Sequence, residues 1–412
     1  MNLRTLCIVW SLAAALMAGG IVLSAPALDS GSAYAQTFAE AKKRVEKKEP
    51  ASKDRPKPQE RTAFTAEEED AAVISGIPDA RVWGDSDTAF ARVLPQASGP
   101  WLAISGGGSD GAYGAGVLTG WTEAGTRPEF AVVTGSSIGS LIAPFAFLGP
   151  RYDEEIRKNF TTIAAADIFE DRVTRDSLFD HWPLKRIIEQ RVTPKLLSEI
   201  AAEHARGRRL FVATTNLDAG RRVLWNMGAI AARGDDKALK LFRDILLASC
   251  SIPGFFSPIG IEVESNGKRF EEMHNDGTLT APFFAIPESM IAAGGPSRPP
   301  LAQLYVIVNS KLGPEFQMPS RTIPGVLGRS IAVALTAALR AEVMLIQVAA
   351  QRHGIALHIA YVDSAFNVPS RGPFDGKYMQ ALYDFGVTAG KKGTAFEKAV
   401  PDLSMRGTSN AQ

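Results

Sequence analysis

The chain has little cysteine and histidine. Its 412 residues include only two cysteines, Cys7 and Cys250, and five histidines. Neither residue type recurs at the spacing of metal ligands, which argues against a disulfide framework and against a metal site. The formal net charge is only +1, so no overall field of one sign favours nucleic acid or an anionic membrane surface. The sequence also has no internal repeat, which excludes repeat architectures.

The N-terminus has the order of a secretory signal. Arg4 gives a positive start, residues 6–23 are apolar, and small residues follow up to Ala33-Tyr34-Ala35. We therefore expect cleavage after Ala35 and an exported protein, periplasmic or secreted, whose one remaining thiol is a small buried residue, Cys250. The apolar run is nearly long enough to span a membrane, so an uncleaved N-terminal anchor is the alternative.

The remaining chain divides by composition. Residues 36–72 are charged and contain few apolar side chains, which is typical of a solvated linker. From Val73 onward the pattern is globular. We therefore assign residues 1–35 to a signal peptide, residues 36–72 to a charged linker and residues 73–412 to one folded catalytic domain.

Short apolar runs alternate with helical stretches in the globular part. This alternation predicts an α/β fold, in which one mainly parallel central sheet is covered by helices on both faces. Asn266-Gly267 signals a hairpin turn, and residues 331–350 are expected to form a core helix. The expected strands are 101–104, 130–134, 210–215 and 304–308, and the other expected helices are 111–124, 138–147, 184–204, 238–248 and 378–390.

The most informative motif is G-x-S-x-G, at Gly135-Ser136-Ser137-Ile138-Gly139. It lies between an apolar run and an apolar helical stretch, and this strand–turn–helix context is that of a nucleophile elbow. Gly135 and Gly139 allow a sharp turn that a Cβ would crowd. The turn lifts the Ser137 hydroxyl out of the sheet edge and places the amide of Ile138 beside it. Taken alone, the motif is also compatible with an ordinary strand-to-helix turn.

A second glycine cluster, Gly106-Gly107-Gly108, precedes the motif by about thirty residues. It follows an apolar run and opens a helical stretch, so its amides are unsatisfied donors at the positive end of a helix dipole. Acyl-transfer enzymes need such donors where the oxyanion forms. The cluster also matches the dinucleotide fingerprint through Gly111, but the acidic residue expected at the end of the next strand is missing.

These motifs together resemble the patatin-like phospholipase family. The family has a glycine-rich oxyanion loop, a G-x-S-x-G nucleophile and a downstream D-G, which is Asp276-Gly277 here. Residues 213–220 and 248–258 also resemble family segments, and the likeness runs from Val73 to about Gly393. Two positions depart from the pattern: Asp110 stands where the family often has Arg or Lys, and Thr278 follows the D-G.

The resemblance implies a patatin-like three-layer αβα sandwich and a Ser–Asp dyad. In that dyad Ser137 attacks an ester carbonyl and Asp276 accepts its proton. The oxyanion hole is then expected from Gly106, Gly107, Gly108 and Ile138. Without the resemblance, Asp276-Gly277 reads as a plain turn. No metal or organic cofactor is implied.

A Ser–His–Asp triad is the mechanistic alternative. It would require a histidine after the acid in chain order, and His353 and His358 are the two residues that follow Asp276. Neither sits in a convincing strand-end loop, and His358 lies inside an apolar run where a structural role is expected. His274 precedes Asp276 by two residues. A dyad is therefore the simpler prediction.

The predicted function is a serine acyl hydrolase of the phospholipase A or lysophospholipase type. The alternatives are a carboxylesterase for small esters and a non-catalytic envelope protein that binds lipid. Phe255, Phe256, Phe283 and Phe284 either line an acyl pocket or belong to the core. The expected partner is a lipid or ester substrate and not nucleic acid; association with a membrane surface and the oligomeric state are left open.

Overall fold

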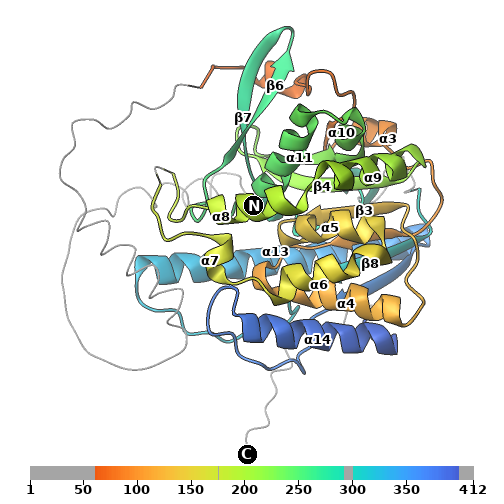
Figure 1. Ribbon diagram of the computed structural model, residues 1–412, viewed down its shortest axis with the longest axis vertical. Coiled ribbons are helices and arrows are strands. Elements are labelled where there is room, and N and C mark those ends of the chain that lie inside the picture. The colour runs from red at the N-terminus through yellow and green to blue at the C-terminus, as the bar shows by residue number, and fades with distance from the viewer. Residues whose placement is uncertain (1–60, 175, 292–299, 399–412) are drawn as a thin grey trace, which may run out of the picture.

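The computed structural model describes residues 61–174, 176–291 and 300–398. In these ranges nine strands form one sheet, with β1-β5-β4-β3-β2-β8-β9 side by side and the β6–β7 hairpin joined to β4 (Figure 1). The strands are β1 (Arg81–Trp83), β2 (Trp101–Ile104), β3 (Val132–Ser136), β4 (Arg209–Asn216), β5 (Arg221–Asn226), β6 (Ile259–Ser265), β7 (Lys268–Asp276), β8 (Gln303–Val308) and β9 (Ala356–Tyr361).

Five strands, β2, β3, β4, β8 and β9, are parallel to one another, while β1, β5 and β7 join as antiparallel neighbours. The helices are α2 (Ala66–Asp70), α3 (Asp87–Arg92), α4 (Gly111–Glu123), α5 (Ile138–Leu148), α6 (Asp153–Thr161), α7 (Ala165–Ile168), α8 (Trp182–Arg191), α9 (Pro194–Ala205), α10 (Met227–Arg233), α11 (Asp236–Ser249), α12 (Glu288–Ile291), α13 (Ile323–His353) and α14 (Gly376–Lys392).

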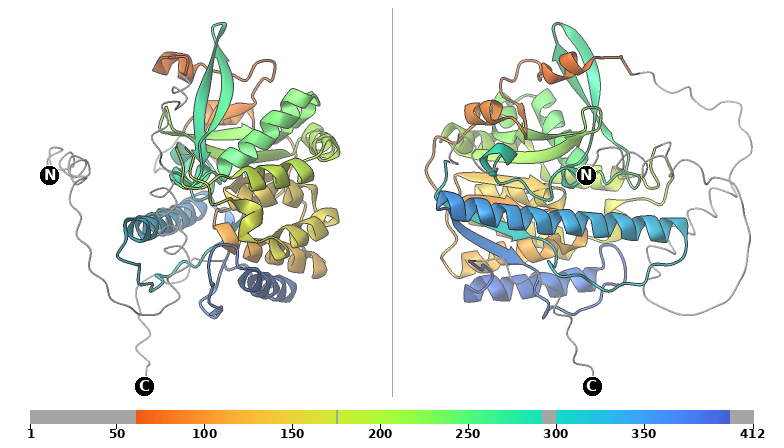
Figure 2. Two further views of the ribbon diagram at one scale, coloured as in Figure 1. Left: turned by 60° about the vertical axis from the view of Figure 1, so that its left-hand side comes forward. Right: turned by 180° about the vertical axis from the view of Figure 1, so that it is seen from behind.

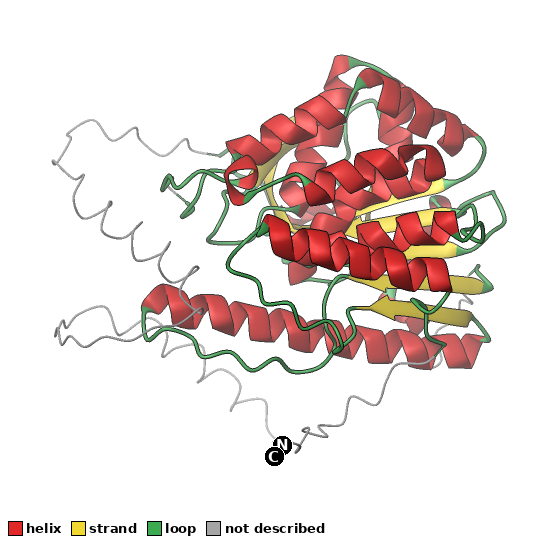
Figure 3. Cartoon of the chain, turned by 60° about the horizontal axis from the view of Figure 1, so that its bottom comes forward, coloured by secondary structure: helices red, strands yellow, loops and turns green. Residues whose placement is uncertain are grey.

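The core consists of two apolar layers, one on each face of the sheet. Side chains alternate along each strand, so Leu102 and Ile104 of β2 pack with α4, α5 and α14 on one face. Trp101 and Ala103 face the other side, with α3 and α13. Figure 3 shows the strands between a thick layer of helices and the isolated α13. The predicted three-layer α/β sandwich with a mostly parallel sheet is confirmed.

Two predicted helices differ from the structure. The expected helix 184–204 is two helices, because Pro194 cannot continue the hydrogen-bond ladder and Thr193 caps α9 through the amide of Leu196. The expected core helix 331–350 belongs to α13, which is longer and only partly buried. By length and composition, Gly328–His353 could span a membrane. Only 17% of its most apolar stretch is buried, so the segment is not enclosed as a core helix would be.

The last residues of the expected linker pack onto the domain. Arg61 forms two hydrogen bonds of 2.8 and 2.6 Å with the carboxylate of Asp218, and Phe64 stacks on Phe270 of β7. The segment 61–72 is therefore fastened to the β7 hairpin. The predicted signal peptide and most of the predicted linker lie outside the described residues.

Candidate active site

Strand β4 brings the two predicted catalytic residues together. Strand β3 pairs with β4 up to its last residue, Ser136, which lies opposite Ala213. Beyond that point β7 pairs with the same edge of β4, and its last residue, Asp276, lies opposite Thr214. Ser137 follows β3 directly, so its side chain emerges at the junction of the two strand ends. The predicted catalytic pair thus sits at the carboxyl edge of the parallel strands, where α/β sheets bind ligands.

The turn at Ser137 has strained backbone geometry. Ser137 has φ 51° and ψ −128°, a region that residues with a Cβ rarely adopt. The flanking glycines make the turn possible: a Cβ at Gly135 would collide with the carbonyl of Gly139, and one at Gly139 would collide with the carbonyl of Ile104. This is the strand–turn–helix geometry expected from the G-x-S-x-G motif, with α5 starting at Ile138.

Ser137 and Asp276 are in direct contact. The Ser137 hydroxyl donates a hydrogen bond of 2.7 Å to Oδ2 of Asp276, and Ser137 remains 8% exposed. The other oxygen, Oδ1, accepts the amide and the hydroxyl of Thr278 at 2.9 and 2.7 Å. Burial raises the pKa of Asp276 to about 6, although these hydrogen bonds act to lower it. The carboxylate is therefore mostly ionised at neutral pH and more basic than an exposed aspartate.

Two further serines hold the turn in place. Ser249, at the end of α11, accepts the amide of Ser137 at 2.9 Å and donates to the carbonyl of Ala213 at 2.8 Å. Ser140 donates to the carbonyl of Ser137 at 2.6 Å. The amide and the carbonyl of Ser137 are thus each held by a serine side chain that lies outside the G-x-S-x-G motif. The residue types alone did not indicate these roles, since a serine in or after an apolar helix has no distinctive pattern.

The glycine-rich loop lies against the turn but differs from the prediction in one residue. The amide of Gly106 donates to the carbonyl of Pro282 at 3.1 Å, so it is occupied and the expected oxyanion role of Gly106 is wrong. Within the described ranges, the amides of Gly107, Gly108 and Ile138 have no hydrogen-bond partner. These three amides are the donors free to stabilise an anion.

Asn309, directly after β8, holds this loop in position and was not predicted. Its side-chain oxygen accepts the amide of Gly114 at 3.0 Å, and its side-chain nitrogen donates to the carbonyl of Ser105 at 2.9 Å. It is completely buried. Gly107 needs to be glycine because a Cβ there would collide with the carbonyl of Asn309. The one available signal was a polar residue at the end of an apolar strand.

Asp110 stands where the family often has a cation, and its side chain is hydrogen-bonded to α14. Its carboxylate accepts a hydrogen bond of 2.7 Å from the hydroxyl of Tyr378 on α14. Burial raises the pKa of Asp110 to about 7. Next to it, Ser109 accepts the amide of Phe374 at 2.9 Å. The residue therefore ties the glycine-rich loop to α14, and its hydrogen bonds do not include Ser137.

The three histidines considered for a triad, His274, His353 and His358, are engaged elsewhere in the part of the chain that the structure describes. His274 contacts Thr214 and Glu272 at 3.0 and 3.1 Å, and burial lowers its pKa. His353 contacts the carbonyl of Met290, and His358 stacks on Tyr305. None of these side chains is hydrogen-bonded to Ser137 or Asp276, so the geometry of a triad is absent from the described residues.

An apolar cavity of about 50 Å³ lies along α5 and reaches Ile138, the residue after Ser137; Ser137 itself does not line it. It is lined by Ile138 and Leu141 of α5, Phe160 of α6, and side chains of α8 such as Ile188. Phe283 and Phe284 lie in the core, and Phe256 packs with Phe179 in a separate cluster, so none of these three residues lines the cavity.

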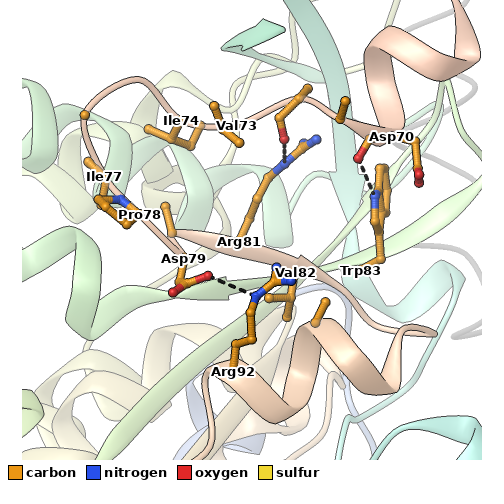
Figure 4. Close-up of a pocket in the computed structure, with 15 residues that line it drawn as sticks. Asp70, Val73, Ile74, Ile77, Pro78, Asp79, Arg81, Val82, Trp83 and Arg92 are labelled. Atoms are coloured by element: carbon orange, nitrogen blue, oxygen red, sulfur yellow. Dashed lines mark hydrogen bonds and ion pairs between the residues drawn. The ribbon is translucent and has the colours of Figure 1, made fainter.

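A larger cavity, of about 420 Å³, lies away from the catalytic pair (Figure 4). It is enclosed by residues 70–83 and the ion pair between Asp79 and Arg92. Neither Ser137 nor Asp276 lines it. Among the described residues, no group of three or more His, Cys, Asp or Glu side chains is arranged to hold a metal ion.

Comparison with known proteins gives a match to a protein family. Residues 102–286 match the family model of patatin-like phospholipases. The chain carries a patatin-like phospholipase domain. The match includes the glycine-rich loop, Ser137 and Asp276. Among solved structures, the chain is similar to VipD from Legionella pneumophila, with 10% identity and a TM-score of 0.37 over 74% of this chain and 68% of that one. No curated protein matches the sequence.

Proposed function

We propose that the protein is a serine lipid acyl hydrolase of the phospholipase A or lysophospholipase type, acting through a Ser137–Asp276 dyad. The observation that supports this most directly is the 2.7 Å hydrogen bond from Ser137 to Asp276, at a strained turn bordered by free amides. The patatin-like domain implies lipid acyl hydrolysis. A carboxylate in direct contact with the serine hydroxyl supplies the base that this chemistry requires.

In the first half-reaction, Oγ of Ser137 attacks the ester carbonyl carbon while Oδ2 of Asp276 accepts the hydroxyl proton. The carbonyl oxygen becomes an anion, which the amides of Gly107, Gly108 and Ile138 stabilise. The tetrahedral intermediate then collapses, and the departing alcohol takes the proton from Asp276. This leaves the acyl group esterified to Ser137.

In the second half-reaction, water attacks the acyl-enzyme carbonyl and Asp276 accepts the water proton. Collapse of the new intermediate breaks the bond to Oγ, the proton returns to Ser137, and the fatty acid leaves. Asp276 can serve both steps because Thr278 holds Oδ1 and leaves Oδ2 directed at the serine.

The apolar cavity lined by Ile138 supports an acyl substrate, since the amide of Ile138 is a proposed oxyanion donor and the cavity is formed almost entirely by hydrocarbon. Its volume of about 50 Å³ is small for a long chain, and this favours the second candidate, a carboxylesterase for small esters. A long acyl chain would require the surrounding helices α6 and α8 to part or the chain to leave along the surface.

A chromogenic ester series of rising chain length, together with defined phospholipids, tests the proposal. We expect a fluorophosphonate probe to label Ser137, and Ser137→Ala to abolish labelling and turnover while leaving the thermal melting curve unchanged. Activity confined to short esters would select the esterase. Folded protein without labelling or turnover would select the non-catalytic lipid-binding alternative.

We also propose that the protein is exported, either periplasmic or secreted. Support comes from the apolar run at residues 6–23 and the small residues that end at Ala35. N-terminal sequencing of protein recovered outside the cytoplasm should find a chain that begins at Gln36. A chain that keeps Met1 and fractionates with membranes would instead indicate the N-terminal anchor.

A further inference from the structure

The outer face of α13 is apolar and uncovered by the described residues. Between Gly325 and Ala350, the exposed side chains that the structure describes are all apolar except Ser330. Val326, Val333, Met344, Leu345 and Val348 are each about half exposed, between 49% and 52%. A helix on the surface of a soluble protein usually carries charges on such a face. Contiguous exposed apolar surface of this kind marks an interaction site.

The position of α13 places this face beside the catalytic edge. The helix has 31 residues and is about 46 Å long, whereas the six-residue strand β8 spans about 20 Å. Its C-terminus leads within two residues into β9, at the amino edge of the parallel strands. The excess length therefore projects past the carboxyl edge, where Ser137 lies. Figure 2 shows α13 crossing the molecule and its N-terminal part extending beyond the strands.

The segment that leads into α13 continues the apolar surface. Phe316 is 92% exposed and Met318 is 74% exposed, the two most exposed large apolar side chains of the described ranges. Arg329 of α13 fixes this segment by donating to the carbonyl of Glu315 at 2.6 Å and to the side chain of Gln317 at 3.3 Å. The exposed side chains are thus held next to the projecting end of the helix.

The charges around this surface are predominantly basic. From Lys311 to His353 the sequence contains one lysine and four arginines, against two acidic residues, Glu315 and Glu342. The whole chain has a formal net charge of only +1, so this is a local feature. An apolar face bordered by arginines complements a bilayer with anionic headgroups, because the hydrocarbon enters the interface while the guanidinium groups meet phosphates.

We propose that this surface binds the protein to an anionic lipid bilayer. We call it the α13 platform and define it by its exposed apolar side chains: Phe316, Met318, Val326, Val333, Met344, Leu345 and Val348. Leu339, Val343 and Ile346 of the same helix are buried against the sheet, so α13 lies in the interface and does not cross the membrane. Docked in this way, the platform places the carboxyl edge of the sheet next to the lipid.

A second copy of this chain is the competing occupant of an apolar face. The predominantly basic charge pattern disfavours it, because a symmetric contact would bring the same arginines toward one another. A bilayer also accounts for the exposed Phe316 and Met318 at one end of the platform, as apolar side chains that enter the interface. The proposal goes beyond hydrolase activity, and its test involves no turnover.

The first test uses a polarity-sensitive fluorophore on Val333→Cys, with Val73→Cys as the matched control, in a Cys7→Ser full-length chain. Val73 is 56% exposed and outside the platform, and the buried Cys250 escapes labelling. Vesicles of ether-linked phosphatidylcholine and phosphatidylglycerol in equal parts are not substrates. We expect a blue shift and loss of iodide quenching at position 333 and no change at position 73.

Equal changes at both positions, or none at position 333, would overturn the proposal. So would a blue shift at position 333 that appears with rising protein concentration in the absence of vesicles, because it would assign the platform to a second copy. Because the two labelled variants differ only in the position of the label, the comparison stays valid even if the N-terminal apolar segment itself holds the protein on the vesicle.

The second test measures vesicle partitioning of surface variants in the exported form of the protein. Val333→Glu should lower the partition coefficient at least about tenfold, while Val73→Glu should stay within about twofold of the parent. Arg321→Gln should lower the preference for anionic over neutral vesicles about fivefold. Circular dichroism confirms that each variant is folded, and folded Val333→Glu protein that partitions like the parent would refute the platform.

Discussion

Oγ of Ser137 lies 2.7 Å from Oδ2 of Asp276, although the two residues are 139 positions apart in the chain. The contact follows from strand pairing: β3 and β7 end against consecutive positions of β4, at Ala213 and Thr214. Since both strand ends are held by backbone hydrogen bonds, the pair is positioned before any substrate arrives. Preorganisation of this kind is what a serine without a histidine partner requires.

The first prediction concerns the base. Asp276→Asn should lower kcat by at least about a thousandfold, because the amide cannot accept the serine proton. The free energy of unfolding at pH 8 should not fall, since burial raises the pKa of Asp276 and an ionised buried carboxylate opposes folding there. Steady-state kinetics and chemical denaturation measure the two quantities. Retention of more than a tenth of the parent activity would contradict the dyad.

The second prediction separates the dyad from a triad. His274→Gln, His353→Ala and His358→Ala should each leave kcat within about tenfold of the parent, once loss of folded protein is corrected for. His274→Gln should cost the most stability, because it leaves the buried Glu272 without one of its partners. A folded His353 or His358 variant as inactive as Ser137→Ala would refute the dyad mechanism, but the proposal of hydrolase activity would stand.

The third prediction concerns pH. Asp276 acts as a base only when ionised, and burial raises its pKa to about 6. The value of kcat/KM should therefore fall about tenfold per pH unit below that pKa and be flat above it. Thr278→Val removes the hydroxyl that stabilises the ionised form, so the midpoint should move upward by about one pH unit. An unchanged midpoint in Thr278→Val would assign the titration to another group.

The fourth prediction concerns the support of the glycine-rich loop. Asn309→Ala removes two side-chain hydrogen bonds, one with the amide of Gly114 and one with the carbonyl of the buried Ser105. It should destabilise the fold by about 2–4 kcal/mol and lower kcat of the folded fraction at least about tenfold. The control is Asn226→Ala, another buried asparagine, which caps α10 through the amide of Ala229. It should cost stability without lowering kcat. Equal kinetic effects of the two variants would contradict a role for Asn309 in positioning the loop.

Local sequence was sufficient for the features that depend on near neighbours. The turn at Ser137 was predictable because Gly135 and Gly139 are the residues that permit it, and the hairpin at Asn266-Gly267 formed where both residues take positive φ. The break between α8 and α9 was also encoded locally, in Thr193-Pro194, but the apolar pattern of residues 184–204 outweighed it in the prediction.

Tertiary structure decided the features that depend on residues distant in sequence. The pairing of β7 with β4 brings Asp276 to Ser137, and a long-range hydrogen bond to Pro282 occupies the amide of Gly106. The sequence of α13 is apolar enough for a core helix, yet only one side meets the sheet. Hydropathy reports how strongly a segment avoids water. Whether that segment is covered by protein or by another apolar phase depends on where the rest of the chain lies.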